Sequence, residues 1–510
     1  MNRKKTAIIN SIVNVGTQML TFVLSFVLRK LFIIYIGIDY LGINTVLAEG
    51  LGMLAITELG FQNVIVFQLY KPLSNGDTEK VSEIITLLKR VYRVVGITIL
   101  ILGLAMLPFL RVIVKNVKVP MSTVYIAYIL LLVGSVVTYF CAFKRTLLYA
   151  DQKQYITSIV DSIVNLGCSL LRLLAIILLK SFYVYTAITI VQNILSNYII
   201  HLRCKKYYPE LRTNVKVNGE LKGILFQDTK NVLFGKIAGY IYSSTDNLVI
   251  SAVLGTGLVG YFGNYTSITK AITRLISYCF GAMQPLIGNY VASESKEASY
   301  SFFKQYTFLR YYIASVVLVP AFCLINRVIE IWLGKEFILE NIIPLLLVID
   351  IYVACVQGAA GEFVSALGYF RYEKYISIIG AVCNLFISVV ASYCVGIKGV
   401  LIGTVVSQFV MWFGRSFILY KFYFEDGLKK YGIYWGKQLI YVIILIGECV
   451  LSKILLGTFQ AEASLLLLMI QGILVVILCI LVHTLVFCKT REFKYFWQWV
   501  LGILSKRRRF

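Results

Sequence analysis

Long apolar segments recur along the whole chain, separated by short connections that carry most of the charged residues. A run of about 20 apolar residues is long enough for a helix to cross a bilayer. The pattern predicts an all-α polytopic membrane protein of about 14 transmembrane helices. These helices are expected at 7–35, 40–69, 90–113, 121–147, 154–179, 182–204, 222–254, 257–284, 300–325, 341–368, 373–397, 399–423, 434–457 and 463–488.

A polar segment between the sixth and seventh spans divides the first twelve into two six-helix lobes, with two extra C-terminal helices after them. Both lobes carry a G-x4-G turn shortly after an intramembrane charge, at 37–42 and 255–260. Six spans per lobe imply a parallel repeat, which transporters commonly build around a substrate path. The expected parts are an N-terminal lobe, a cytoplasmic connector, a C-terminal lobe, the extra helix pair and a tail, at 1–206, 207–221, 222–425, 426–488 and 489–510.

The charges at the ends of the spans predict the orientation of the chain. With the N-terminus in the cytoplasm, inner loops and tails hold 32 of the 49 Lys and Arg residues, and outer connections hold 10. Cytoplasmic loops carry such an excess, and an even number of spans returns the C-terminus to the cytoplasm. The tail combines an apolar stripe from Phe493 to Leu504 with the basic run 506–509, which predicts an amphipathic helix on the inner membrane surface.

Composition narrows the class of protein. A mean hydropathy of +0.80 excludes a soluble protein of this length. The formal net charge of +24 is spread over eight inner segments, which favours anionic membrane lipids as partners and argues against nucleic acid. The eleven cysteines and two histidines, His201 and His483, show no metal-ligand spacing, and no cofactor is expected.

Charged residues within the predicted spans are the candidate functional residues, because charge at that depth is costly and usually faces a wet cavity. Lys270 and Arg274 are spaced i, i+4 on one helix face. Lys270 lies about 20 Å along its helix, too deep for its ammonium to reach an interface easily. The pair therefore suits an anion in a cavity; the alternative is salt bridges to acids such as Asp246 or Asp350.

Further candidates come from spans one, five and seven. Arg29 lies near the outer end of the first span, and Lys236 and Asp246 lie deep in the seventh. In span five, Asp161 and Arg172 belong to one helical stripe, either lining a cavity or pairing with neighbouring helices. The predicted substrate-binding cations are Arg29, Arg172, Lys236, Lys270 and Arg274.

The predicted acids for coupling or charge pairing are Asp161, Asp246, Glu58 and Asp350. The sequence leaves open whether they relay a coupling cation or neutralise the basic residues. Enzyme signatures are missing: there is no GxxxxGK[ST] phosphate loop, and no large external loop with paired acids. The chain is therefore not expected to be an enzyme, and any pumping must use gradients.

Several short motifs resemble a known family. They are LRKL at 28–31, GIDYLG at 37–42, ELGF at 58–61, STDNLVIS at 244–251, LG at 254–255, VGY at 259–261 and AMQP at 282–285. Together with the span layout, they make the chain similar to the polysaccharide-transporter (Wzx-type oligosaccharide flippase) family of the multidrug/oligosaccharidyl-lipid/polysaccharide exporter superfamily.

The resemblance implies two six-helix lobes around a cationic cavity that flips a polyprenyl-pyrophosphate-linked oligosaccharide across the bacterial cytoplasmic membrane. Basic residues of spans one, seven and eight would hold the pyrophosphate, because Arg and Lys pair well with a compact anion at low dielectric. Other polysaccharide assembly proteins are expected partners. The alternatives are a peptidoglycan lipid-precursor flippase, a multidrug exporter of the same superfamily or, from another class, a membrane polysaccharide polymerase.

Overall fold

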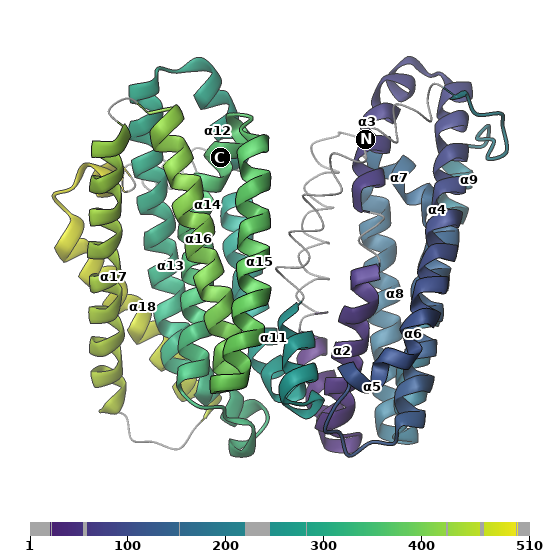
Figure 1. Cartoon of the computed structure of the whole chain (residues 1–510), viewed down its shortest axis with the longest axis horizontal. Coiled ribbons are helices and arrows are strands. Elements are labelled where there is room, and N and C mark those ends of the chain that lie inside the picture. The colour runs from purple at the N-terminus through teal and green to yellow at the C-terminus, as the bar shows by residue number, and fades with distance from the viewer. Residues whose placement is uncertain are drawn as a thin grey trace. The chain divides into compact units, whose positions relative to one another are not determined.

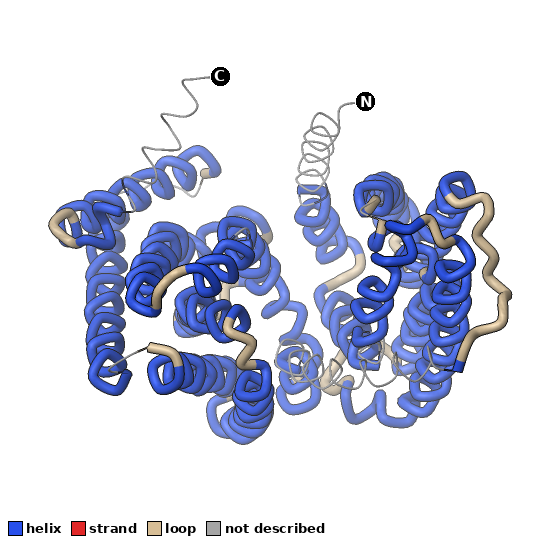
Figure 2. Tube along the Cα trace, turned by 90° about the horizontal axis from the view of Figure 1, so that it is seen from above, coloured by secondary structure: helices blue, strands red, loops and turns tan. Residues whose placement is uncertain are grey.

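The computed structural model describes residues 21, 23–54, 59–151, 153–219, 245–281, 283–424, 427–458, 464–495 and 497. Within these ranges the regular structure is helical, as the tube view shows (Figure 2). Nine of the described helices are long and apolar enough to cross a membrane. The predicted class, an all-α polytopic membrane protein, is therefore confirmed, whereas the count of fourteen spans stays a prediction.

The chain forms two compact units, Met1–Gly260 and Tyr261–Phe510. The predicted connector lies inside the first unit, and most of the seventh predicted span lies outside the described residues. The first unit contains a helix over 23–35 and then α2 (Ile38–Leu54), α3 (Leu59–Asn75), α4 (Thr78–Met106), η2 (Leu107–Phe109), α5 (Leu110–Ile113), α6 (Met121–Cys141), α7 (Phe143–Ala150), α8 (Gln154–Leu174), η3 (Ala175–Leu179), α9 (Phe182–Tyr207) and η4 (Ile250–Leu254) (Figure 1).

In the first unit α9 packs against both α6 and α8, and α4 packs against α6. The two G-x4-G motifs contact each other. A Cβ on Gly42 would lie 2.3 Å from the carbonyl oxygen of Thr256, and one on Gly260 would lie 2.6 Å from that of Ile38. Because only glycine permits this approach, the motifs form a close backbone contact.

The second unit contains the rest of α11 (Thr256–Gly281), then α12 (Met283–Ser293), α13 (Lys296–Trp332), η5 (Lys335–Phe337), α14 (Ile342–Ala366), α15 (Phe370–Val395), α16 (Ile397–Phe422), α17 (Gly427–Gly457) and α18 (Leu465–Phe487) (Figure 1). The long helix α13 packs against α14, α17 and α18. The last two helices therefore join the bundle through α13.

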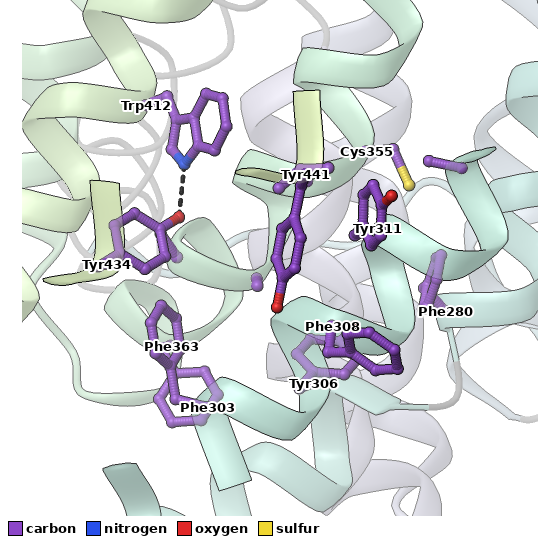
Figure 3. Close-up of a cluster of buried hydrophobic side chains, with 14 of the residues drawn as sticks. Phe280, Phe303, Tyr306, Phe308, Tyr311, Cys355, Phe363, Trp412, Tyr434 and Tyr441 are labelled. Carbon is purple, nitrogen blue, oxygen red and sulfur yellow. Dashed lines mark hydrogen bonds between the residues drawn. The ribbon is translucent and has the colours of Figure 1, made fainter. Parts of the chain in front are cut away.

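Aromatic side chains dominate the core of the second unit (Figure 3). Tyr311 stacks on Tyr441 with ring centroids 4.2 Å apart, which fixes α17 against α13. Trp412 donates a hydrogen bond of 2.6 Å from Nε1 to the hydroxyl of Tyr434, so its buried indole nitrogen is satisfied. This core also takes the start of the predicted amphipathic tail, because Phe493 is buried in it. The rest of the tail falls largely outside the described residues.

Residues 211–218, which we call the strap, lie along the N-terminal half of α4. Strap backbone nitrogens donate to α4 side chains: Asn218 to a Glu83 carboxylate oxygen at 2.7 Å, and Arg212 to the hydroxyl of Ser82 at 3.1 Å. In the other direction, Lys89 Nζ donates to Oδ1 of Asn214 at 3.0 Å. The connector is therefore bound to the first unit over most of its length.

Candidate functional site

Two predicted cations of the first unit meet at one tyrosine. Tyr185 on α9 interacts electrostatically with both Arg29, on the helix over 23–35, and Arg172, near the end of α8. The guanidinium of Arg172 lies over the Tyr185 ring, 5.7 Å from its centroid, and the ring of Phe32 packs edge-on against the same ring at 4.7 Å. We call Arg29, Arg172, Tyr185 and Phe32 the arginine cluster.

Hydrogen bonds orient both arginines of the cluster. Arg29 is half-buried, and its Nη2 donates to the carbonyl oxygen of Gly260 at 3.2 Å. Arg172 donates from Nη2 to Oγ1 of Thr189 at 3.1 Å. The Nε of Arg172 is buried without a hydrogen-bond partner among the described residues. A buried unpaired donor is unfavourable, so the arrangement favours an anion that would accept from it.

The polar stripe of α8 faces α9 along its length. Arg145 of α7 forms a two-pronged ion pair with Asp161, at 2.7 Å from Nη1 and 2.8 Å from Nη2, and Ser196 of α9 also donates to Asp161. Asn165 accepts from Gln192 of α9 at 3.4 Å. At this end of the stripe the polar residues join neighbouring helices, whereas Arg172 at the other end belongs to the arginine cluster.

Lys270 and Arg274 lie on α11 in the second unit, and both side chains are exposed. Their i, i+4 spacing on a continuous helix places them on one face. Because neither is buried in the core of its unit, both can be reached from outside it. The structure thus leaves this pair accessible to an anion.

Asp350 on α14 belongs to a partly buried chain of hydrogen-bonded polar side chains. It accepts a hydrogen bond of 3.2 Å from Nε2 of Gln408, and Gln357 donates to the oxygen of the same Gln408 amide. Arg415 donates to Gln357 at 3.0 Å and forms an ion pair with Glu373. Asp350 is therefore connected to the polar interior of the second unit, between α14, α15 and α16.

Of the remaining predicted residues, the structure describes only Asp246. Lys236 and Glu58 lie outside the described residues. Asp246 is half-buried beside Asn247, whose side-chain nitrogen donates to Glu49 at 2.8 Å. Among the described residues there is no group of three or more His, Cys, Asp or Glu side chains that could hold a metal ion.

Phe32 and Tyr185 of the arginine cluster, and Thr189, which accepts from Arg172, were not predicted from the sequence. Tyr185 and Thr189 lie one helical turn apart on α9, so they share a face. Their spacing was the only available signal, and tyrosine and threonine are too common in membrane helices to stand out. The ion-pair partner of Asp161, Arg145, was likewise not selected. It falls at the end of the predicted span 121–147, whereas the structure ends α6 at Cys141 and places Arg145 on the separate short helix α7.

Comparisons with known proteins agree with this architecture. Residues 8–291, more than half of the chain, match the family model "Polysaccharide biosynthesis protein". The search of curated proteins gave no match by sequence. The fold is similar to a lipid II flippase, MurJ, in an inward closed conformation, with a TM-score of 0.69, 13% identity, and coverage of 93% of this chain and 99% of that one.

The fold is also similar to an inward-facing multidrug resistance MATE family transporter of the MOP superfamily. The TM-score is 0.58 at 15% identity, covering 79% of this chain and 97% of that one. At such identities the likeness shows a shared fold, and both proteins are transporters rather than enzymes. The chain is a multi-pass membrane protein that belongs to the polysaccharide biosynthesis protein family and shares its fold with these two transporters.

Proposed function

We propose that this protein flips a polyprenyl-pyrophosphate-linked oligosaccharide from the inner to the outer leaflet of the bacterial cytoplasmic membrane. The observation that carries the proposal is the family match over residues 8–291, which connects the chain to polysaccharide biosynthesis. The likeness to a lipid II flippase supports a lipid-linked substrate. Alternating access would move the substrate past fixed cationic residues.

Each unit by itself carries cations that we propose as pyrophosphate ligands. In the first unit, Arg172 has a buried unpaired Nε, and Arg29 meets the same tyrosine. In the second unit, Lys270 and Arg274 are exposed on one face of α11. Charge-assisted hydrogen bonds to a phosphate contribute about 1.5–3 kcal/mol each, so losing two of them should lower transport strongly.

The test is a flipping assay in proteoliposomes. A fluorophore-labelled polyprenyl-pyrophosphate oligosaccharide is reconstituted, and its appearance in the opposite leaflet is followed with an impermeant quencher. We expect the double variant Lys270→Ala and Arg274→Ala to lower the initial rate at least tenfold. The matched control is Lys335→Ala with Arg371→Ala, which removes one lysine and one arginine that are exposed elsewhere in the same unit.

An unchanged rate in the double variant would refute the role of the α11 cations, and an inactive wild type would refute the proposed substrate. A second candidate is flipping of the peptidoglycan lipid precursor, which the likeness to MurJ over 93% of the chain favours. Labelled lipid II in the same vesicles discriminates the two. Transport of lipid II alone would select the second candidate.

A further inference from the structure

A pocket of about 250 Å³ lies in the first unit, where the helix over 23–35 ends beside the turn between α8 and α9. Its walls come from four separate segments of the chain. They combine aromatic rings with hydroxyl groups and one ammonium. The residues that matter for its chemistry are Tyr35, Tyr40, Thr123, Lys180, Phe182 and Tyr183.

An unusual backbone places the ammonium at this pocket. Helix α8 ends in the π-helical turn η3, and Lys180 follows in the left-handed region at φ 47° and ψ 34°. Ser181 then caps the start of α9. Non-glycine residues rarely adopt positive φ, and π-helical turns and such backbone outliers concentrate at functional sites. The turn holds Nζ of Lys180 over the ring of Tyr35, 5.6 Å from its centroid.

The lining suits a sugar ring better than a purely apolar ligand. Tyr35 and Tyr183 are partly exposed, and the ring of Phe182 packs edge-on against Tyr40 at 5.2 Å, so several aromatic rings line the pocket. Such faces pack against the C–H faces of a pyranose. Thr123 and Tyr183 share a hydrogen bond of 2.9 Å at the wall, where they can exchange bonds with sugar hydroxyls. Pockets for drug-sized ligands measure ~300–1,000 Å³, so this smaller one fits a single ring.

Phe32 connects the arginine cluster to the pocket wall. The ring of Phe32 lies 4.7 Å from Tyr185 of the cluster and 6.1 Å from Phe182 at the pocket. Tyr35 follows Arg29 by six residues on one helix, which corresponds to about 9 Å of rise. A diphosphate at the arginines would therefore lie close enough for its attached glycan to reach the pocket.

We propose that this pocket binds one sugar of the transported glycan, beyond the sugar that carries the diphosphate. The inference rests on the proposed function, since it names where the glycan of that substrate is recognised. Tyrosines and lysines also gather at membrane interfaces, where they contact lipid headgroups. Contact with lipid headgroups does not require tyrosine rings to line one pocket, as Tyr35, Tyr40 and Tyr183 do here.

The test compares a short and a long substrate in the proteoliposome assay: polyprenyl-pyrophosphate with one sugar, and the same lipid with an oligosaccharide. Tyr35→Ala removes an exposed ring, and Lys180→Asn removes the charge while keeping a residue that tolerates left-handed backbone. We expect each variant to lower the initial rate for the long substrate about five- to tenfold, as loss of one aromatic or polar contact predicts. The rate for the short substrate should stay unchanged.

Tyr198→Ala is the matched control, because Tyr198 is an exposed tyrosine of α9 away from the pocket. Equal losses for both substrates, or no loss, would overturn the proposal and assign the rings to the lipid interface. If the wild-type protein moves neither substrate, the proposed function fails. A direct binding measurement then decides whether the pocket binds a sugar. Free oligosaccharides of the same series, titrated into the detergent-solubilised full chain, should then bind wild type and not Tyr35→Ala; no binding to wild type overturns the pocket too.

Discussion

The ion pair between Arg310 and Glu362 should be among the most sensitive points of the second unit. The Arg310 side chain is 6% exposed, and besides Glu362 it donates to the carbonyl oxygen of Cys355 at 2.6 Å and to the hydroxyl of Tyr306 at 2.9 Å. Its guanidinium also lies over the ring of Phe280, 4.3 Å from the centroid. Replacing Arg310 with methionine keeps the aliphatic length and removes all of these contacts.

Breaking a buried ion pair from one side costs about 3–5 kcal/mol, because the remaining charge loses its partner. Glu362 is 23% exposed, so water can reach it and the lower half of that range is expected. A unit of about 250 residues loses ~2–4 °C of melting temperature per kcal/mol. Arg310→Met should therefore melt roughly 6–16 °C below wild type.

The assay is thermal unfolding in detergent, monitored by tryptophan fluorescence. Measurements on Glu362→Gln and on the double variant complete a double-mutant cycle. The two single losses should overlap, giving a coupling of about 1–3 kcal/mol. Lys335→Met, at a lysine whose side chain is 83% exposed, serves as the control and should melt like wild type. Melting of Arg310→Met within about 2 °C of wild type, or additive single losses, would refute the reasoning.

Three more predictions use other sites. Arg172→Gln should lower flipping of the lipid-linked oligosaccharide about tenfold, as loss of a charge-assisted bond predicts, with an unchanged melting temperature; equal transport would contradict the role of the arginine cluster. Gly399→Ala places a Cβ 2.2 Å from the backbone carbonyl of Ala391, so it should cost at least about 1–3 kcal/mol in thermal unfolding; a wild-type melting curve would show that α15 and α16 can separate cheaply. Burial is the largest single influence on the pKa of Glu492 and raises it. The hydrogen bond from Lys437 at 2.7 Å, a backbone hydrogen bond and the positive charges of Lys437 and Lys304 together outweigh burial and hold the pKa below the ordinary 4.5. This stabilisation is present above pH 4.5 and is lost as pH falls through the lowered value, so wild type should lose melting temperature in acid relative to Glu492→Gln; parallel pH profiles would contradict it.

The helical class and the family could be predicted because both depend on local sequence. Apolar run length alone identifies a membrane helix, and nine of the described helices are long and apolar enough to cross a membrane. The LRKL and GIDYLG motifs fall within the matched region 8–291, so the resemblance is confirmed by the family model. The lobe boundaries and the orientation stay predictions.

The site was harder to predict because its geometry depends on which helices pack together. Arg29 was selected as a charge near the outer end of the first span and Arg172 as part of a helical stripe in the fifth. Nothing in the sequence showed that Tyr185 would bring them together. The G-x4-G motifs were interpreted as a repeat of two lobes, whereas the structure adds that Gly42 contacts the turn at Thr256. Helix pairing is a long-range property, and single-sequence patterns do not encode it.

The strap limits the distance that the connector can span. A free chain can extend by at most ~3.3–3.6 Å per residue. The strap cannot extend in this way, because hydrogen bonds from Arg212 to Ser82 and from Asn218 to Glu83 hold it against α4. Extra residues inserted at the exposed turn of Pro209 would bulge harmlessly before the strap. The same residues inserted after Asn218 would lengthen the chain that follows the strap. Added residues are therefore absorbed before the strap, whereas residues added after the strap increase the distance that the following chain can span.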